Sequence, residues 1–144
     1  MERIIKEKIS ADHLLYVSLK YTKTTDVMLN LLERWKIMIE SSIDRLLENA
    51  KKSRLISSIP EAPKLKIDKI REVYKKNQDI LKTMDLLNFF KKVPELEKTR
   101  EGEFRKNVAL KVLYRGEWID VNLDKLKEYN DTLERFISYI KQIL

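Results

Sequence analysis

The fold is decided by Met28–Leu47, which reads MLNLLERWKIMIESSIDRLL. Its apolar residues recur at steps of three and four, which is the period of a helix with one apolar face. The polar stretch 24–26 can cap the start of this helix, and the pattern continues to Lys52. Such a helix would be about 40 Å long, because each residue adds 1.5 Å. That length predicts an elongated bundle or a seam between two copies of the chain.

Three further stretches carry the same helical periodicity. Asn122 directly precedes the last of them and is suited to cap it. A polar run at 22–26 follows the first stretch, and the sequence leaves open whether the chain turns there. The predicted helices cover residues 3–22, 25–52, 66–92 and 123–144.

Two segments lack helical periodicity. Residues 53–66 interrupt it, because Pro60 and Pro63 lack an amide donor and restrict the residues before them. We expect this segment to connect two helices of a single domain that spans 1–144. Residues 95–106 hold eight charged residues, and we expect them to be exposed and mobile.

The period changes again after residue 107. Val108–Tyr114 is apolar and β-branched in character, and Glu117–Val121 is a second short run of this kind. Arg115 and Gly116 lie between them, which predicts a β-hairpin over 107–121 that leans on the helices. The predicted fold class is therefore all-α: an antiparallel, up-and-down helical bundle with long helices and a small β-hairpin before the C-terminal helix.

The composition excludes several kinds of active site. The chain has no Cys, one His and two Gly, which excludes thiol chemistry, multi-histidine metal sites and a Gly-rich phosphate loop. No apolar run is long enough to span a membrane, and the first residues lack the apolar core of a signal peptide. Lys, Glu and Ile are plentiful and Gln is rare, as in hyperthermophile proteins. We therefore expect an archaeal, cytoplasmic protein without cofactor, metal or membrane contact.

Charge is distributed unevenly along the chain, whose formal net charge is +7. Residues 51–100 hold 14 basic and 7 acidic residues, whereas the stretches on either side each hold 8 of both. A basic zone attracts phosphates or acidic proteins, although a solvated Lys-rich surface has the same composition. Lys outnumbers Arg by 21 to 9, whereas base-reading contacts favour Arg. The candidate nucleic-acid-binding residues are Lys51, Lys52, Arg54, Lys64, Lys66, Lys69, Arg71, Lys75 and Lys76.

Other polar groupings resemble functional sites in composition alone. Asp12 and His13 are adjacent and so point about 100° apart on a helix, which prevents Asp12 from orienting His13 as in a catalytic triad. Tyrosines and lysines alternate over 16–23 and could stack bases, although tyrosines at the edge of a core are commoner. A row of carboxylates on the long helix lacks the Glu-x-x-His motif of metal-binding bundles and is interpreted as a solvated face. No catalytic residue is predicted; the carboxylates are Glu33, Glu40, Asp44 and Glu48.

Long antiparallel helices, a crossover that contains prolines and the small size together resemble the HEPN-type helical bundles of archaea and bacteria. Members with ribonuclease activity carry an Arg that is followed four to six residues later by His. Here the only histidine is His13, and the only arginine before it is Arg3, ten positions upstream. The hairpin is also not a general feature of that family. The resemblance therefore implies a non-catalytic binding member, often dimeric.

Two hypotheses of function follow. The first is a non-enzymatic interaction protein that self-associates, or binds another protein, through the stripe of the long helix or through the terminal helix. The second is an RNA- or DNA-binding module that uses residues 51–92. An enzyme would need a polar pocket that the sequence does not indicate. The stripe residues predicted to self-associate are Met28, Leu31, Leu32, Trp35, Ile39 and Ile43.

Overall fold

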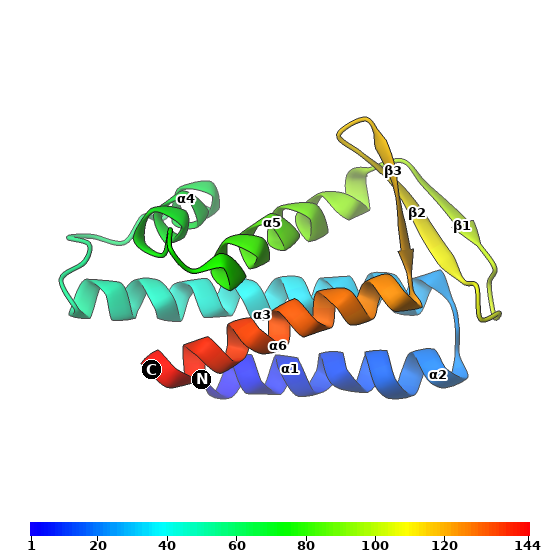
Figure 1. The fold of residues 1–144 in the computed structure, drawn as a ribbon, viewed down its shortest axis with the longest axis horizontal. Helices are drawn as coiled ribbons and strands as arrows, with labels where there is room; N and C mark the ends of the chain where they lie inside the picture. The colour runs from blue at the N-terminus through cyan, green and yellow to red at the C-terminus, as the bar shows by residue number, and fades with distance from the viewer.

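A computed structural model describes all 144 residues of the chain. Helices packed lengthwise form most of the molecule, and a small sheet covers one end of them (Figure 1). No helix combines the length and the apolar character that crossing a membrane requires. The helices are α1 (Glu2–His13), which continues through a π segment (Leu14–Ser18) into α2 (Leu19–Tyr21), then α3 (Thr25–Lys52), α4 (Pro63–Val73), α5 (Gln78–Lys92) and α6 (Leu123–Ile143). The strands are β1 (Lys98–Glu101), β2 (Ala109–Tyr114) and β3 (Glu117–Asn122), and a 3-10 turn (Val93–Glu95) precedes β1.

The chain reverses between α2 and α3, so that α3 runs antiparallel to α1 (Figure 1). The Thr24 hydroxyl accepts a hydrogen bond from the Val27 amide at 3.3 Å and so caps α3. The break that the sequence left open at 22–26 is therefore a turn. At the other end of the chain, the Asn122 side chain accepts from the Lys125 amide at 2.8 Å, which confirms the predicted cap of α6.

The stretch 66–92, predicted as one helix, is two helices joined by a turn at residues 74–77. Asn77 explains the division, because its side chain accepts a hydrogen bond from the Ile80 amide at 3.1 Å and starts α5 as an N-cap. α4 begins earlier than predicted, at Pro63, where a proline costs no helical hydrogen bond. α4 and α5 consequently point in different directions over α3 (Figure 1).

The all-α fold class predicted from the sequence is wrong, because the structure contains a three-stranded antiparallel sheet in the order β1-β2-β3. β2 and β3 form the hairpin around residues 115 and 116, whose φ values of 52° and 79° are those of a type I′ turn. The third strand, β1, lies within 95–106, the segment predicted to be mobile. Its four residues are polar or charged, so it has no apolar alternation that would reveal a strand.

The sheet is joined to the start of α3 by polar contacts. The Arg100 guanidinium donates to Asp26 at 2.5 Å, and the Thr25 amide donates to the Glu103 carboxylate at 2.9 Å. Two carboxylates thus lie at the positive end of the α3 dipole, where negative charge is favoured. The Phe104 amide also donates to the Lys23 carbonyl at 2.7 Å, so the loop after β1 holds the turn that precedes α3.

The core surrounds α3, and this overturns the predicted self-association stripe. The indole of Trp35 packs against Phe90 from α5 and Tyr129 from α6, with ring centroids 5.8 and 6.4 Å apart. α1 covers another side of the same helix. The stripe therefore has no surface left for a second copy. Its residues are at most 3% exposed: Met28, Leu31, Leu32, Trp35, Ile39 and Ile43.

Tyr129 makes folding sensitive to alkaline pH. Burial raises the pKa of its phenol to about 12, and the neighbouring Glu128 adds to this effect. In an unfolded chain this pKa is about 10, so the stabilisation is present below pH 10 and is lost as pH rises toward 12. We expect wild type to lose about 2 kcal/mol more stability than Tyr129→Phe between pH 9 and pH 12.

Urea denaturation at a series of pH values measures this difference. Tyr21→Phe is the matched control, because that phenol is 78% exposed. Parallel stability curves for wild type and Tyr129→Phe would contradict the prediction.

Candidate nucleic-acid interface

The nine basic residues selected from the sequence divide into two groups in the structure. Lys66, Lys69 and Arg71 each pair with a carboxylate, at 2.8, 3.4 and 2.8 Å. Their partners on the helices neutralise them, so this part of the prediction yields no free cationic surface. The other six are exposed and form no ion pair: Lys51, Lys52, Arg54, Lys64, Lys75 and Lys76.

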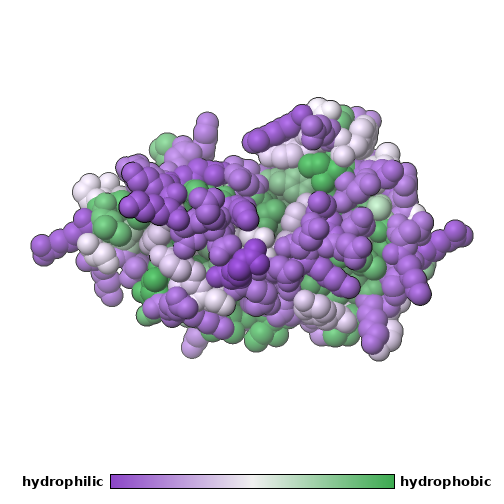
Figure 2. Space-filling model, in the orientation of Figure 1, coloured by the Kyte–Doolittle hydropathy of each residue, from purple (hydrophilic) through white to green (hydrophobic).

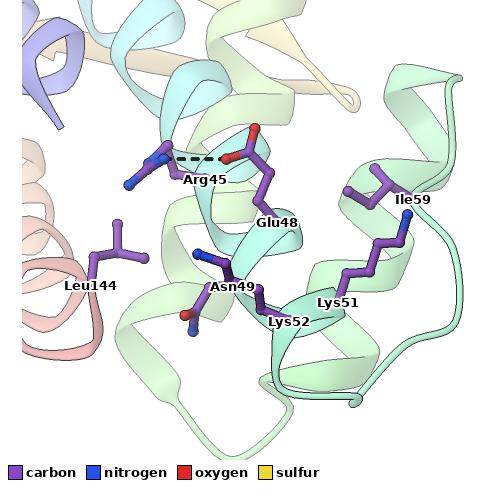
Figure 3. Close-up of a pocket in the computed structure, with 7 residues that line it drawn as sticks. All are labelled: Arg45, Glu48, Asn49, Lys51, Lys52, Ile59 and Leu144. Carbon is purple, nitrogen blue, oxygen red and sulfur yellow. Dashed lines mark hydrogen bonds and ion pairs between the residues drawn. The ribbon is translucent and has the colours of Figure 1, made fainter.

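The last turns of α3 form one wall of a cleft of about 640 Å³, which we call the α3 cleft. Figure 3 shows Arg45 and Asn49 on the side facing Leu144, which directly follows α6, with Lys51 reaching toward Ile59. The single acidic residue in the cleft, Glu48, pairs with Arg45 at 3.2 Å. The remaining lysines therefore give the cleft a positive charge. Its lining residues are Arg45, Glu48, Asn49, Lys51, Lys52, Ile59 and Leu144.

Arg54 ends α3 beside this cleft in a conformation that glycine normally adopts. Its φ is +60°, in the left-handed region. The Leu55 amide donates to the Ala50 carbonyl at 2.9 Å and the Arg54 amide to the Lys51 carbonyl at 3.0 Å, which together form a Schellman cap. An arginine thus occupies a strained position at the basic end of the helix, and strain of this kind concentrates at functional sites.

A second cleft, of about 400 Å³, lies at the turn between α4 and α5, and we call it the turn cleft. Its basic residues are Lys75 and Lys76, and its aromatic residues are Tyr74 and Tyr139, whose rings meet edge to face at 6.4 Å. Asn77 contributes an amide. Two cations beside two aromatic rings are the combination that binds stacked bases and their phosphates.

The two clefts adjoin at Tyr74. Its hydroxyl lies 3.5 Å from the Leu46 carbonyl of α3, one turn before Asn49 of the α3 cleft. Burial raises the pKa of Tyr74 and the charge of Tyr139 adds to the rise, while the side chain of Asn49 acts in the opposite direction. Tyr74 therefore stays neutral at physiological pH, and its hydroxyl donates to the Leu46 carbonyl.

The catalytic and metal candidates do not converge. His13 is exposed on α1, and Asp12 instead accepts a hydrogen bond from Lys8, which also donates to Glu134. Burial disfavours the charge of Lys8, but these two hydrogen bonds outweigh it and raise the pKa of the ammonium. No group of three acidic, His or Cys side chains could hold a metal ion. The carboxylates of the long helix are not gathered, and three of them pair with basic side chains: Glu33, Asp44 and Glu48.

The aromatic and basic residues over 16–23 are engaged in contacts within the chain. The Tyr16 hydroxyl accepts a hydrogen bond from the buried Asn130 side chain at 2.9 Å, so it lies at the edge of the core. Lys23 donates to the Lys20 carbonyl at 2.6 Å. Tyr21 is exposed, with Lys20 over its ring at 5.7 Å.

Sequence reasoning missed the polar and aromatic members of the two clefts. Arg45 and Asn49 are polar residues on the flank of the apolar stripe of α3, a position that is typical of ordinary surface residues. Only Asn77 offers a sequence signal for the turn cleft. Asn before an apolar run is typical of a helix N-cap, and a cap within 66–92 indicates a turn between two helices. Tyr139 enters the site only through the packing of α6 against the turn.

Comparisons with protein-family models, with curated proteins and with solved structures each found no match to this chain. The HEPN resemblance therefore stays a prediction. The function proposed below is argued from the two clefts themselves.

Proposed function

We propose that the chain is a non-enzymatic binding protein that holds single-stranded nucleic acid across the α3 cleft and the turn cleft. The observation that carries this proposal is that each cleft holds two lysines without an ion pair, and that the pair in the turn cleft lies beside Tyr74 and Tyr139. Four lysines, Lys51, Lys52, Lys75 and Lys76, would contact phosphates. The two tyrosines would offer ring faces and edges to unstacked bases, which a duplex keeps inside its stack. The HEPN resemblance, as a further proposal, implies the same non-catalytic role.

Fluorescence anisotropy with a labelled 12-nucleotide RNA tests the proposal. We expect wild type to bind with a Kd of about 1–100 µM near physiological salt and to lose affinity as salt is raised. Replacing the four lysines by Glu should weaken binding at least about 30-fold. It should also reduce the slope of the log of the binding constant against the log of the salt concentration by about 3, since each contact with a single-strand phosphate contributes roughly 0.7 to that slope. Tyr139→Leu should weaken binding about tenfold through lost stacking.

A matched variant separates the clefts from total charge. In this variant Glu replaces four other lysines, so the net charge changes by the same amount. The four are exposed, form no ion pair and lie outside both clefts: Lys82, Lys92, Lys106 and Lys127. This variant should keep most of the affinity. Equal losses in the two fourfold variants, equal affinity for duplex DNA, or no binding at 50 mM salt would each overturn the proposal.

A further inference from the structure

One face of the continuous rod formed by α1, the π segment and α2 exposes large apolar side chains that nothing in the chain covers. Ile5, Ile9, Val17 and Tyr21 are 39%, 63%, 41% and 78% exposed. α1 lies along the outer margin of the molecule in Figure 1, and Figure 2 shows hydrophobic residues at that margin. The opposite face of the same rod is buried against α3, and Lys8 on that face donates to Glu134 of α6; its buried residues are Ile4, Lys8, Ala11, Leu15 and Leu19.

The π segment keeps these residues on one face. With His13, they recur at steps of four, and in a regular α-helix each such step drifts by about 40° around the axis. Within the π segment the Leu19 amide donates to the Leu14 carbonyl, five residues back, so the wider turn takes up the drift. We call Ile5, Ile9, His13, Val17 and Tyr21 the α1 face; it is about 24 Å long.

The charges beside the α1 face favour a copy of the same helix in antiparallel orientation. If residue 11 marks the centre, Ile5 lies opposite Val17, and Ile9 opposite His13. Glu2 then meets Lys20, and neither makes an ion pair within the chain. A parallel pair would instead place Glu2 against Glu2 and Lys20 against Lys20, which repel each other.

We propose that the α1 face is a homodimer interface in which the continuous rod Glu2–Tyr21 of one copy packs antiparallel on the same rod of a second copy. The proposal is independent of nucleic-acid binding, because neither cleft contains a residue of this face. A single helix face buries less than a standard interface, so we expect a Kd of about 10–500 µM. Its register is fixed by the pairs Ile5–Val17, Ile9–His13 and Glu2–Lys20.

Sedimentation velocity of the full chain from about 5 µM to 1 mM tests the association. Wild type should approach twice the 17.3 kDa of one chain as concentration rises. Ile9→Glu should weaken association at least about tenfold, because it places a carboxylate in an apolar seam. Leu65→Glu is the matched control, since Leu65 is 55% exposed on α4 and should leave the dimer unchanged. Circular dichroism checks that both variants are folded.

Two further experiments test the orientation. Glu2→Lys and Lys20→Glu should each weaken the dimer, and the double variant should restore it. The chain has no cysteine of its own, so the single variants Ile9→Cys and His13→Cys can be mixed and each contributes one thiol. Oxidation of that mixture should yield chiefly the 9–13 disulfide. A monomer at 1 mM, a dimer that Ile9→Glu leaves intact, or disulfides chiefly between identical positions would overturn the proposal.

Discussion

Replacing Trp35 by alanine is expected to lower the free energy of unfolding by about 4 kcal/mol. The side chain is fully buried at the middle of α3, and it stacks on Phe90 and meets the edge of Tyr129. Removing it leaves a large cavity among α3, α5 and α6, because rigid helices cannot collapse into the space. Urea denaturation followed by far-UV circular dichroism measures the loss.

Trp35→Phe is the informative companion. The indole Nε1 is buried without a hydrogen-bond partner, and an unpaired buried donor costs about 1–3 kcal/mol. Phe removes this donor while it keeps an aromatic ring between Phe90 and Tyr129. We therefore expect a loss of no more than about 1.5 kcal/mol, since the smaller cavity and the removed donor act in opposite directions. Similar losses for Phe and Ala would contradict this account of the core.

Gly102→Ala is expected to cost about 2–3 kcal/mol. Gly102 follows β1 with a φ of +63°, and a Cβ there would lie 2.8 Å from the Asn107 carbonyl oxygen. Because that oxygen belongs to the backbone, the loop itself must shift. The shift would disturb Glu103, whose carboxylate accepts from the Thr25 amide at the start of α3.

The other glycine of the chain provides a control. Gly116 also has a positive φ, +79°, but no atom lies within 4 Å of a Cβ built on it. Gly116→Ala should therefore lower the free energy of unfolding only by the cost of holding alanine at a positive φ, about 1 kcal/mol. The difference in the free energy of unfolding between the two variants, measured by urea denaturation, gives the cost of the steric contact with Asn107. Equal costs would show that the contact with Asn107 is relieved without penalty.

Apolar periodicity predicts where helices lie, but it does not identify what packs against their apolar faces. Met28–Leu47 predicts a helix, and α3 spans 25–52 as expected. The same stripe predicts a dimer seam equally well, because period alone does not distinguish a face against α1, α5 and α6 from one against a second copy. The residues of the α1 face show no regular helical period, since their four-residue step fits one face only with a π segment.

The elements that sequence reasoning missed owe their form to contacts distant in the chain. β1 is a strand because Arg100 and its neighbours pair with β2 and with the start of α3, although its own residues carry no apolar alternation. The charge of the candidate interface likewise depends on residues distant in the chain. The basic excess in 51–100 was visible, but which lysines are neutralised depends on partners such as Asp44 and Asp85 from other helices.

The charged outer strand also bears on how copies of the chain behave when crowded. β1 borders the sheet with Lys98, Arg100 and Glu101, and its outer backbone groups have no strand beside them. A foreign strand that docked there would have to bury or match these charges, which opposes open-ended edge-to-edge aggregation. The charges of β1 thus protect this edge of the sheet against pairing with strands of other molecules.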